Sequence, residues 1–286
     1  MKIQELGDRW PKAYRYLLEH YQVIDAARIA RFYRPKKIYK YYTFGSEYWK
    51  KNLYDGEICF NSPSCFNDRL DSRWFIDYDK LLSARFETIG KNWRESDLSQ
   101  SGFLDIAIPT YEEDLYYLRD LFRISCFSET PYSHVMWGHY ADKHRGFCVE
   151  YDTSCLPETM NLLMPVVYTD KPYDATLILD MDNQYASLIP TLFKSKDWSY
   201  ECEWRICIKD KNEEDKLIIS SVDAITGVYL GLYSTIPHEE LIKLEMWVKE
   251  HNVTLYQMQR SYLSYDLVSN TFEDIRSGKK TTGLFI

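Results

Sequence analysis

The sequence predicts an α+β protein with a largely antiparallel sheet and flanking helices. Helical and strand-like patterns follow one another without the strict alternation that a parallel doubly wound sheet requires. No linker rich in Gly, Ser or Pro divides the 286 residues, and no internal repeat is visible. We therefore expect one α+β domain over residues 36–286, preceded by a helical extension over residues 1–35.

The first quarter of the chain predicts a helix, two strands and a polar loop. Apolar residues recur at three- and four-residue steps through residues 1–34, and Pro35 ends this helical pattern. Residues 37–42 alternate as a strand, residues 44–54 fit a short helix, and Gly56 lies where a left-handed C-cap belongs. A second strand is expected at residues 57–60. Residues 61–71 are so rich in Pro, Ser, Asn and Asp that we expect a loop.

The remaining elements mix in no regular order. Helices are predicted at residues 79–89 and 111–118, and strands at residues 121–127, 146–151, 164–168 and 205–208. A helix rich in Trp and His precedes the strand at 146–151, and a further helix is expected at 184–193. The last third has the clearest patterns, with a strand at 225–230, a helix at 237–250 and strands at 253–258 and 264–268.

Composition excludes several classes of protein. With 45% hydrophobic and 16% aromatic residues, the chain is not disordered as a whole. Its net charge of −8 gives no overall attraction to nucleic acid or to a membrane. No apolar run approaches about 18 residues, and the first residues lack the apolar core of a signal peptide. We expect a soluble, cytoplasmic protein with no membrane partner.

Familiar catalytic and metal-binding motifs are missing from the sequence. It contains no GxxxxGK[ST] or GxGxxG phosphate loop, no GxSxG elbow and no HExxH pair. The seven Cys are scattered without a CxxC pair, so we expect reduced thiols that bind no metal. The 25 Tyr suit wet pockets and interfaces, although drift from Phe to Tyr explains them equally well.

Three separate segments interleave aromatic residues with polar and charged ones, at residues 60–71, 136–147 and 198–205. This shared character predicts one composite pocket. In the first segment, Asn67, Asp68 and Asp71 could hold a divalent cation, but local turn hydrogen bonds explain such loops more often. In the second, His139 and His144 are five residues apart and do not share a helix face, so a structural role for His139 is the simpler interpretation.

The third segment contains the sharpest candidate, Glu201-Cys202-Glu203-Trp204-Arg205. In a strand, Glu201, Glu203 and Arg205 would share one face. Arg205 would neutralise one of the two carboxylates, and a partly buried carboxylate beside Arg is a reasonable catalytic group. A solvated strand face would explain the same pattern without any catalytic role.

Five ordered motifs resemble those of the bacterial family called domain of unknown function 2971. They are Tyr39-Lys40-Tyr41, Asn61 to Asp71, Cys126-Phe127-Ser128, Met136 to Phe147, and Tyr200 to Arg205. The resemblance spans residues 39–205 and is expected to extend to about residue 268. The family name implies no activity.

A weaker resemblance is to the ADP-ribosyltransferase fold, including its toxin branch that modifies nucleic acids. It implies a split, largely antiparallel sheet that binds NAD as a substrate. It implies that Lys40 holds the adenosine side of NAD, although many members carry His or Arg there, and that Ser62 supports the nicotinamide ribose. Glu203 would bond the ribose 2′-hydroxyl, and Glu201 would activate the acceptor. The remaining residues that this resemblance places around NAD are Tyr41, Asn67, Trp137, His139 and Arg205.

Three functions compete at this stage. The first is an NAD-dependent ADP-ribosyltransferase, a toxin or phage-defence effector that modifies RNA, DNA or protein and has an antitoxin or other partner protein. The second is a metal-dependent nuclease that uses Asp68, Asp71, His139 and Glu150. The third is a non-catalytic binding module that uses the Tyr-rich surface.

Overall fold

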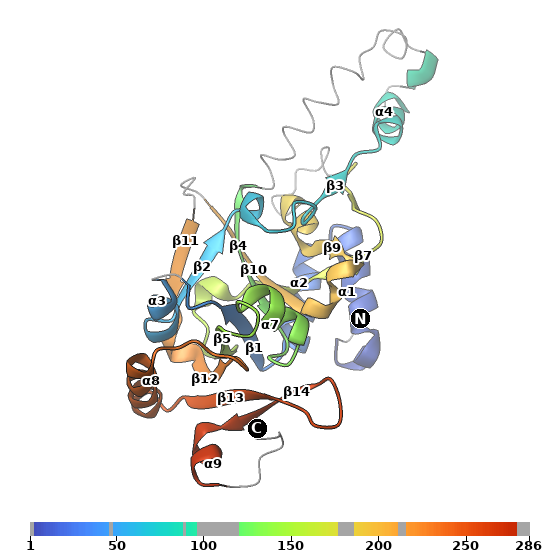
Figure 1. Ribbon diagram of the computed structural model, residues 1–286. Helices are drawn as coiled ribbons and strands as arrows, with labels where there is room; N and C mark the ends of the chain where they lie inside the picture. Colours follow the sequence, from blue (N-terminus) through green and yellow to red (C-terminus); the bar gives the residue numbers. More distant parts are fainter. Residues whose placement is uncertain are drawn as a thin grey trace.

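The computed structural model describes residues 3–45, 48–87, 90–95, 120–176, 186–210 and 216–278. A ten-stranded sheet forms its centre, with helices at both ends and on its faces (Figure 1). The strands of this sheet are β1 (Lys37–Tyr42), β2 (Glu57–Asn61), β4 (Phe122–Ser128), β5 (Phe147–Asp152), β6 (Leu163–Pro165), β10 (Glu203–Lys209), β11 (Lys216–Ser220), β12 (Ile225–Leu230), β13 (Thr254–Arg260) and β14 (Leu267–Thr271).

The main path through the sheet has the order β11-β2-β4-β1-β5-β12-β13-β14, while β10 pairs with β4 and β6. Within the described residues of this sheet, β12 and β13 are the parallel pair, joined through helix α8 (His238–Glu250), and the other pairs are antiparallel. This confirms the predicted α+β class with a largely antiparallel sheet. Two small parallel pairs lie outside it, β3 (Trp74–Phe75) with β8 (Tyr173–Asp174) and β7 (Val167–Thr169) with β9 (Phe193–Ser195).

Strand β4 has β10 along one edge and two separate strands, β1 and β2, along the other. β10 pairs with β4 along its whole length, from Glu203 opposite Ser128 to Lys209 opposite Phe122. On the other edge, β2 meets β4 at Ile124 and β1 meets it at Ser128. Between these two contacts the sheet opens, because neither β1 nor β2 continues the ladder there. This opening places the side chains of β1 and β10 around one space.

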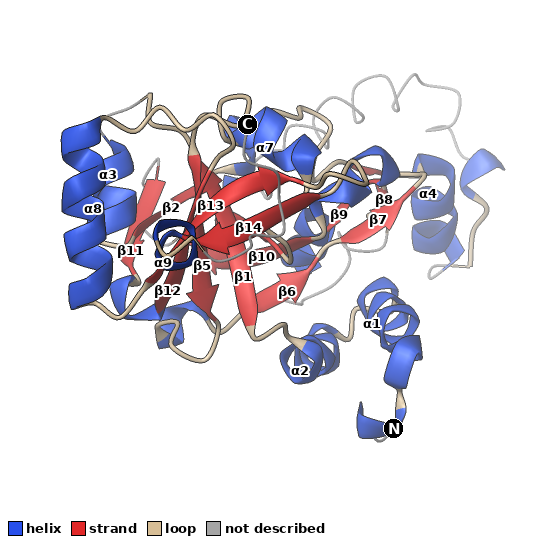
Figure 2. Cartoon of the chain, turned by 60° about the horizontal axis from the view of Figure 1, so that its bottom comes forward, coloured by secondary structure: helices blue, strands red, loops and turns tan. Residues whose placement is uncertain are grey.

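The helices are α1 (Trp10–Glu19), α2 (Val23–Tyr33), α3 (Tyr48–Tyr54), α4 (Tyr78–Glu87), α7 (His134–Tyr140), α8 and α9 (Phe272–Arg276). Figure 2 shows α3 and α8 together at one end of the sheet and α1 and α2 at the other. The two N-terminal helices join the main hydrophobic core. Trp10 stacks on Tyr33 with ring centres 5.2 Å apart, and the Tyr14 hydroxyl donates to the Pro165 carbonyl at 3.0 Å.

Several predicted elements differ from those observed. The predicted N-terminal helix is two helices, because Tyr21 has a left-handed φ of 60° between α1 and α2. The predicted helix at 184–193 is instead a 3₁₀ helix, Ala186–Leu192, followed by β9, and Pro190 inside it has no N–H to continue an α-helix. The strand predicted at 164–168 is broken at Val166 into β6 and β7.

Three other predictions concern the ends of elements. The helix predicted at 44–54 begins at Tyr48, and the strand predicted at 264–268 begins at Leu267, after a turn closed by the Ser261 N–H and the Asp266 carbonyl at 2.9 Å. The strand predicted at 205–208 begins earlier, at Glu203. The helix predicted at 111–118 lies outside the described residues.

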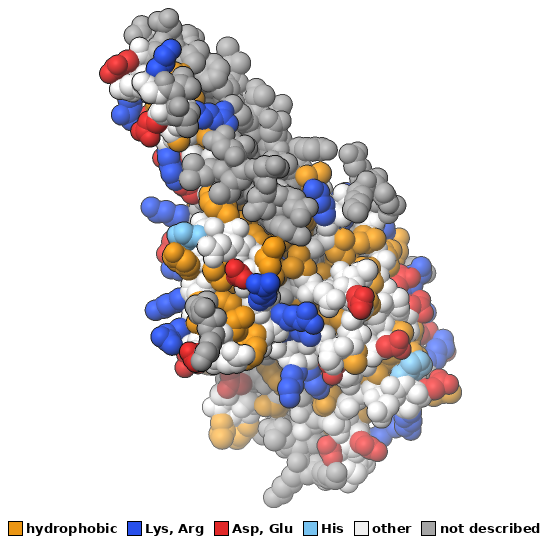
Figure 3. All heavy atoms as spheres, turned by 180° about the vertical axis from the view of Figure 1, so that it is seen from behind, with side chains coloured by type: hydrophobic (Ala, Val, Ile, Leu, Met, Phe, Trp, Pro, Cys, Tyr) orange, Lys and Arg blue, Asp and Glu red, His pale blue; other side chains and the backbone are white. Residues whose placement is uncertain are grey.

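The surface mixes charges of both signs. Figure 3 shows Lys and Arg side chains interspersed with acidic and hydrophobic ones on the face opposite that of Figure 1. No helix in the described ranges is both long enough and apolar enough to cross a membrane. All seven Cys are free thiols.

The connection from α7 to β5 depends on a glycine. Asp142, Lys143 and His144 have φ values of 46°, 55° and 67°, and successive left-handed residues end a right-handed helix. The chain then passes so close to β1 that a Cβ on Gly146 would lie 2.0 Å from the Tyr42 carbonyl oxygen. β5 can therefore pair with β1 immediately after this turn only with Gly at position 146.

We predict that Gly146→Ala lowers the free energy of unfolding by about 1–3 kcal/mol or more, because backbone must move to admit the methyl group. Gly138→Ala is the matched control, since a Cβ at Gly138 in α7 meets no atom within 4 Å. That control should be neutral or more stable by up to about 1 kcal/mol, from helix propensity. Urea unfolding of both variants checks this, and equal stabilities would contradict it.

Candidate functional site

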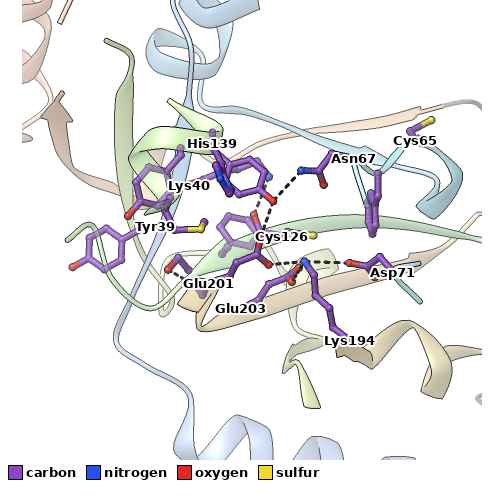
Figure 4. A pocket seen from close by; sticks show the side chains of 16 residues that line it. Tyr39, Lys40, Cys65, Asn67, Asp71, Cys126, His139, Lys194, Glu201 and Glu203 are labelled. Carbon is purple, nitrogen blue, oxygen red and sulfur yellow. Dashed lines mark hydrogen bonds and ion pairs between the residues drawn. The ribbon is translucent and has the colours of Figure 1, made fainter. Parts of the chain in front are cut away.

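A cavity of about 380 Å³ lies beside the opening in the sheet. Its walls come from β1, β4 and β10, from α7, from residues 65–71, and from Lys194 and Glu201 before β10 (Figure 4). The predicted site residues that line it are Lys40, Tyr41, Asn67, His139, Glu201 and Glu203. Segments far apart in sequence therefore meet at one cavity, whose volume is in the range of small-molecule sites.

Arg205 joins the two segments that carry Asp71 and Glu203 at the floor of this cavity. Its side chain is fully buried and makes a bidentate pair with Asp71, at 2.8 Å to Oδ1 and 2.6 Å to Oδ2. It also donates to both carboxylate oxygens of Glu203, at 2.7 and 3.1 Å, and to the Thr191 carbonyl at 2.6 Å. Arg205 thus fastens the loop that ends at Asp71 to strand β10 and fixes the Glu203 carboxylate.

A second buried cation, Lys194 on β9, joins three carboxylates. Its Nζ lies 2.5 Å from Glu201 Oε2, 3.0 Å from Glu203 Oε2 and 3.2 Å from Asp71 Oδ2 (Figure 4). The cluster formed by Asp71, Lys194, Glu201, Glu203 and Arg205, here called the ionic cluster, contains three acidic and two basic side chains. All five side chains are buried, so each charge depends on its partners in the cluster.

The environments of Glu201 and Glu203 shift their ionisation in opposite directions. Burial and the nearby Glu203 carboxylate raise the pKa of Glu201 to about 7, against the opposing effects of Lys194 and Tyr140. Burial would also raise the pKa of Glu203, but Arg205 and Lys194 outweigh it and hold that pKa well below its usual range. The site therefore favours the ionised form of Glu203, whereas Glu201 can exchange a proton near neutral pH.

A chain of hydrogen bonds runs from Glu201 to the loop above the cavity. The Tyr140 hydroxyl on α7 donates to Glu201 Oε1 at 2.7 Å, and the Asn67 amide donates to the Tyr140 oxygen at 3.2 Å. Beside this chain, the Tyr200 hydroxyl lies 3.2 Å from His139 Nδ1. Two routes thus connect the loop to Glu201. One runs from Asn67 through Tyr140, and the other runs from Asp71 through Lys194.

Lys40 on β1 projects into the opening of the sheet. Its Nζ donates to Ser125 Oγ and to the Cys126 carbonyl of β4, both at 2.9 Å. Burial lowers the pKa of Lys40, and both of these acceptors are neutral. An ammonium group has three N–H donors, so the two bonds leave one donor for a ligand in the cavity.

Three predicted NAD-binding residues do not line the cavity. Ser62 is nearly buried, and its hydroxyl bonds Asp120 and the Ser64 backbone N–H as the cap of a short 3₁₀ helix. Trp137 is fully buried, where its indole N–H donates to the Pro131 carbonyl at 2.6 Å and its ring packs edge-on against Tyr41. Arg205 lies behind Glu203, so its role is to hold carboxylates.

The prediction that Glu201 and Glu203 share one face of a strand was wrong. Glu201 ends a 3₁₀ helix, Lys196–Glu201, and Cys202 has a left-handed φ of 45°. β10 therefore begins only at Glu203, and no continuous strand face carries both Glu201 and Glu203. The two carboxylates nevertheless face the same cavity, because Lys194 lies between them.

The residues of the nuclease hypothesis lie in different environments. Asp71 is paired with Arg205 and Lys194, while Asp68 is exposed and accepts from the Leu70 backbone N–H. Glu150 belongs to another polar cluster, in which Lys37, Tyr39, Thr226 and Tyr229 all donate to it. In the part of the chain that the structure describes, no three His, Cys, Asp or Glu side chains are placed to hold a metal ion.

Sequence reasoning missed Lys194 and Tyr140. Lys194 follows an apolar run and stands close to Lys196 and Asp197, and a Lys among other charged residues gives no local signal of burial. Tyr140 lies in the motif at 136–147, but its link to Glu201 joins residues 61 positions apart. Only its position among aromatic and polar neighbours could have drawn attention to it.

Comparison with known proteins supports one of the two resemblances. Residues 136–206 match the model of a family described as Protein of unknown function (DUF2971). The family predicted from the motifs is therefore confirmed over this segment. No curated protein and no solved structure matches the chain, so the ADP-ribosyltransferase-like fold stays a prediction.

The DUF2971 segment coincides with much of the site. It begins within α7, so that it includes His139 and Tyr140, and it ends just after Arg205. It also contains Lys194, Glu201 and Glu203, so four members of the ionic cluster lie within it and Asp71 lies outside. The family match thus covers the residues whose carboxylates and cations shape the cavity floor.

We predict that Arg205→Met lowers the free energy of unfolding by about 3–5 kcal/mol, since it leaves the buried carboxylates of Asp71 and Glu203 short of a cation. Arg276→Met is the matched control, because Arg276 pairs with Glu245 at the surface with 63% of its side chain exposed. That control should cost about 1 kcal/mol or less. Denaturant unfolding measures both, and a mild effect at Arg205 would refute the role assigned to it.

The ionisation of Glu201 also predicts a pH dependence of stability. Its pKa is about 7 in the folded chain against an ordinary value of 4.5, so the folded state binds this proton more tightly. The resulting stabilisation is fully present below pH 4.5 and is lost as the pH rises to about 7. Over that interval, wild type should lose stability relative to Glu201→Gln, which cannot titrate. Urea unfolding at several pH values checks this, and parallel profiles for the two proteins would rule it out.

Proposed function

We propose that this protein is an NAD-dependent ADP-ribosyltransferase whose active site is the cavity at the opening of the sheet. The observation that carries the proposal is the opposite ionisation of Glu201 and Glu203 on one cavity floor. Two carboxylates with separated pKa values divide the acid–base and electrostatic roles in reactions that break a bond to a sugar. Bound NAD would supply such a bond, between nicotinamide and ribose.

Glu203 provides the fixed negative charge in this proposal. Arg205 and Lys194 keep it ionised and hold its carboxylate in place. Positive charge develops on the ribose as its bond to nicotinamide breaks, and a preorganised anion stabilises that charge. Arg205 and Lys194 already pair with the Glu203 carboxylate and offset part of its charge. Its effect on the ribose therefore depends on the net negative charge of the whole ionic cluster.

Glu201 provides the acid–base function. Its pKa of about 7 lets it accept a proton from an acceptor nucleophile near neutral pH. Tyr140 and Lys194 orient its two oxygens separately, which fixes the direction of proton transfer. This agrees with the role that the fold resemblance implied for Glu201, although the local backbone differs from an extended strand.

The walls of the cavity suit a ligand with polar groups and a flat ring. Lys40 offers an N–H donor next to the aromatic ring of Phe127, 5.1 Å from its Nζ. Tyr41, Asn67 and His139 line the same space, so they stay in the proposed NAD site. Aromatic walls of this kind stack on planar rings and exclude water, which limits futile hydrolysis.

The proposal leaves the acceptor to be found among RNA, DNA and protein. As a toxin or phage-defence effector, the protein would modify a cellular target, and an antitoxin or other protein would be its partner. The free thiols of all seven Cys fit a reducing compartment, and we include a cytoplasmic location in the proposal. A non-catalytic binding module is the competing function, and it requires no ionised carboxylate in the cavity.

We predict that the purified protein releases nicotinamide from labelled NAD and transfers label to one of three separate pools of RNA, DNA or protein. Glu203→Gln should reduce both nicotinamide release and transfer by about 100- to 1,000-fold, because the developing charge loses its partner. Glu201→Gln should reduce transfer by about 100- to 10,000-fold and leave some hydrolysis, because only the acceptor needs the base.

Glu19→Gln is the control for the same chemical change at the surface, where Glu19 pairs with Arg15. It should behave as wild type, and thermal melts establish that all variants are folded. Activity of Glu203→Gln equal to wild type would end the proposal. An inactive wild type that binds a macromolecule equally well with and without Glu203→Gln would favour the binding module.

A further inference from the structure

Lys194 is buried among carboxylates of the site, although it lies on the short strand β9. Its side chain is 5% exposed, and its Nζ contacts carboxylates from three parts of the chain. Asp71 comes from the loop, Glu201 from the end of a 3₁₀ helix, and Glu203 from the start of β10. The ring of Trp198 covers the ammonium, with its centre 5.1 Å from Nζ. Lys194 is thus the point at which these segments meet.

The ammonium of Lys194 is surrounded by carboxylates. It donates hydrogen bonds to Glu201 Oε2 at 2.5 Å and to Glu203 Oε2 at 3.0 Å, and it forms an ion pair with Asp71 Oδ2 at 3.2 Å. Lys194 therefore acts on any reaction in the cavity chiefly through the carboxylates that it holds.

Arg205 does not duplicate this role. Its guanidinium pairs with Asp71 and Glu203, and no ion pair joins it to Glu201 in the described ranges. Within those ranges, Lys194 is the cation that pairs with Glu201. Without Lys194, Glu201 would face Glu203 with no positive charge between them, and like charges in a buried site disfavour double ionisation.

We infer that Lys194 is a positioning residue, whose ammonium lets Glu201 and Glu203 be ionised side by side and joins both to the loop through Asp71. The catalytic consequence rests on the proposed function, whereas the electrostatic role stands on the contacts alone. The titratable or charged groups around Glu201 are Tyr140 on α7, Tyr168 on β7, Lys194 on β9, Tyr200 next to it in the chain and Glu203 on β10. Among these five, Lys194 is the positive one.

The test is to follow the ionisation of Glu201 directly. Carboxyl carbons of Glu are labelled with ¹³C, the Glu201 signal is assigned by its loss in Glu201→Gln, and the pH of its transition is measured by NMR. In Lys194→Met that transition should move to higher pH by about 1 pH unit or more, because the ionised form has lost its counter-charge. Lys194→Arg should restore most of the wild-type transition.

Lys196→Met is the matched control, since Lys196 lies two residues away and pairs with Asp170 at the surface with 55% of its side chain exposed. It should leave the Glu201 transition in place. A purely structural role for Lys194 predicts that Lys194→Met is less stable but keeps the same transition, and that result would overturn the inference. The readout needs no NAD, so an inactive wild type would end the proposed function and leave this test intact.

A second measurement covers the case in which Lys194→Met does not fold. The double variant Lys194→Met/Glu201→Gln removes the cation together with the carboxylate that depends on it. At a pH above the raised Glu201 transition, it should fold and melt at a higher temperature than Lys194→Met alone, because the uncompensated Glu201 charge is gone. A double variant no more stable than Lys194→Met would contradict the pairing of these two residues.

Discussion

The buried pair between Arg205 and Asp71 is the interaction on which the site depends. Both side chains are withdrawn from water, at 0% and 2% exposure, so each charge would be costly alone. Their bidentate contact joins residues 134 positions apart and closes the loop onto the sheet. The pair then constrains Glu203, which shares Arg205, and Lys194, which shares Asp71. A change at one member therefore affects the whole ionic cluster.

The sheet supplies the space that this cluster borders. β1 and β2 both reach the same edge of β4 but at different points along it, and between them that edge has no strand partner, whereas β10 pairs with the other edge throughout. Lys40 donates to the Cys126 carbonyl in that interval, so a side chain satisfies a group that a continuous ladder would have satisfied. The opening and the cavity have the same cause, which is the divergence of two strands.

Tyrosine hydroxyls connect the hydrophobic core to these polar groups. Tyr14 donates to the Pro165 carbonyl, Tyr41 to the Thr130 carbonyl and Tyr140 to Glu201. Tyr39 and Tyr229 both donate to the buried Glu150 carboxylate. Each of these rings is partly or wholly buried, so its hydroxyl needs a partner that Phe would not require. Specific hydrogen bonds, rather than drift from Phe, account for these five tyrosines.

The sequence by itself determined the α+β class, most of the strands and the polar loop, because periodicity and turn chemistry are local properties. It also singled out Glu201, Glu203 and Arg205 and the motifs of the DUF2971 segment. It could not reveal Lys194, since a single Lys carries no pattern that distinguishes burial from exposure. Nor could it show that Trp137 would be core, since a Trp in a motif that mixes apolar residues with His, Tyr and Asp suits a pocket wall as well as a core.

Only the tertiary structure decided which charges meet. The pairing of Arg205 with Asp71, the contact of Tyr140 with Glu201 and the left-handed backbone at Cys202 all depend on segments brought together by the sheet. The ionisation of a carboxylate follows from such long-range neighbours and from its burial, neither of which is encoded next to it in the chain. Glu201 and Glu203 are therefore alike in sequence and different in charge because the fold surrounds them differently.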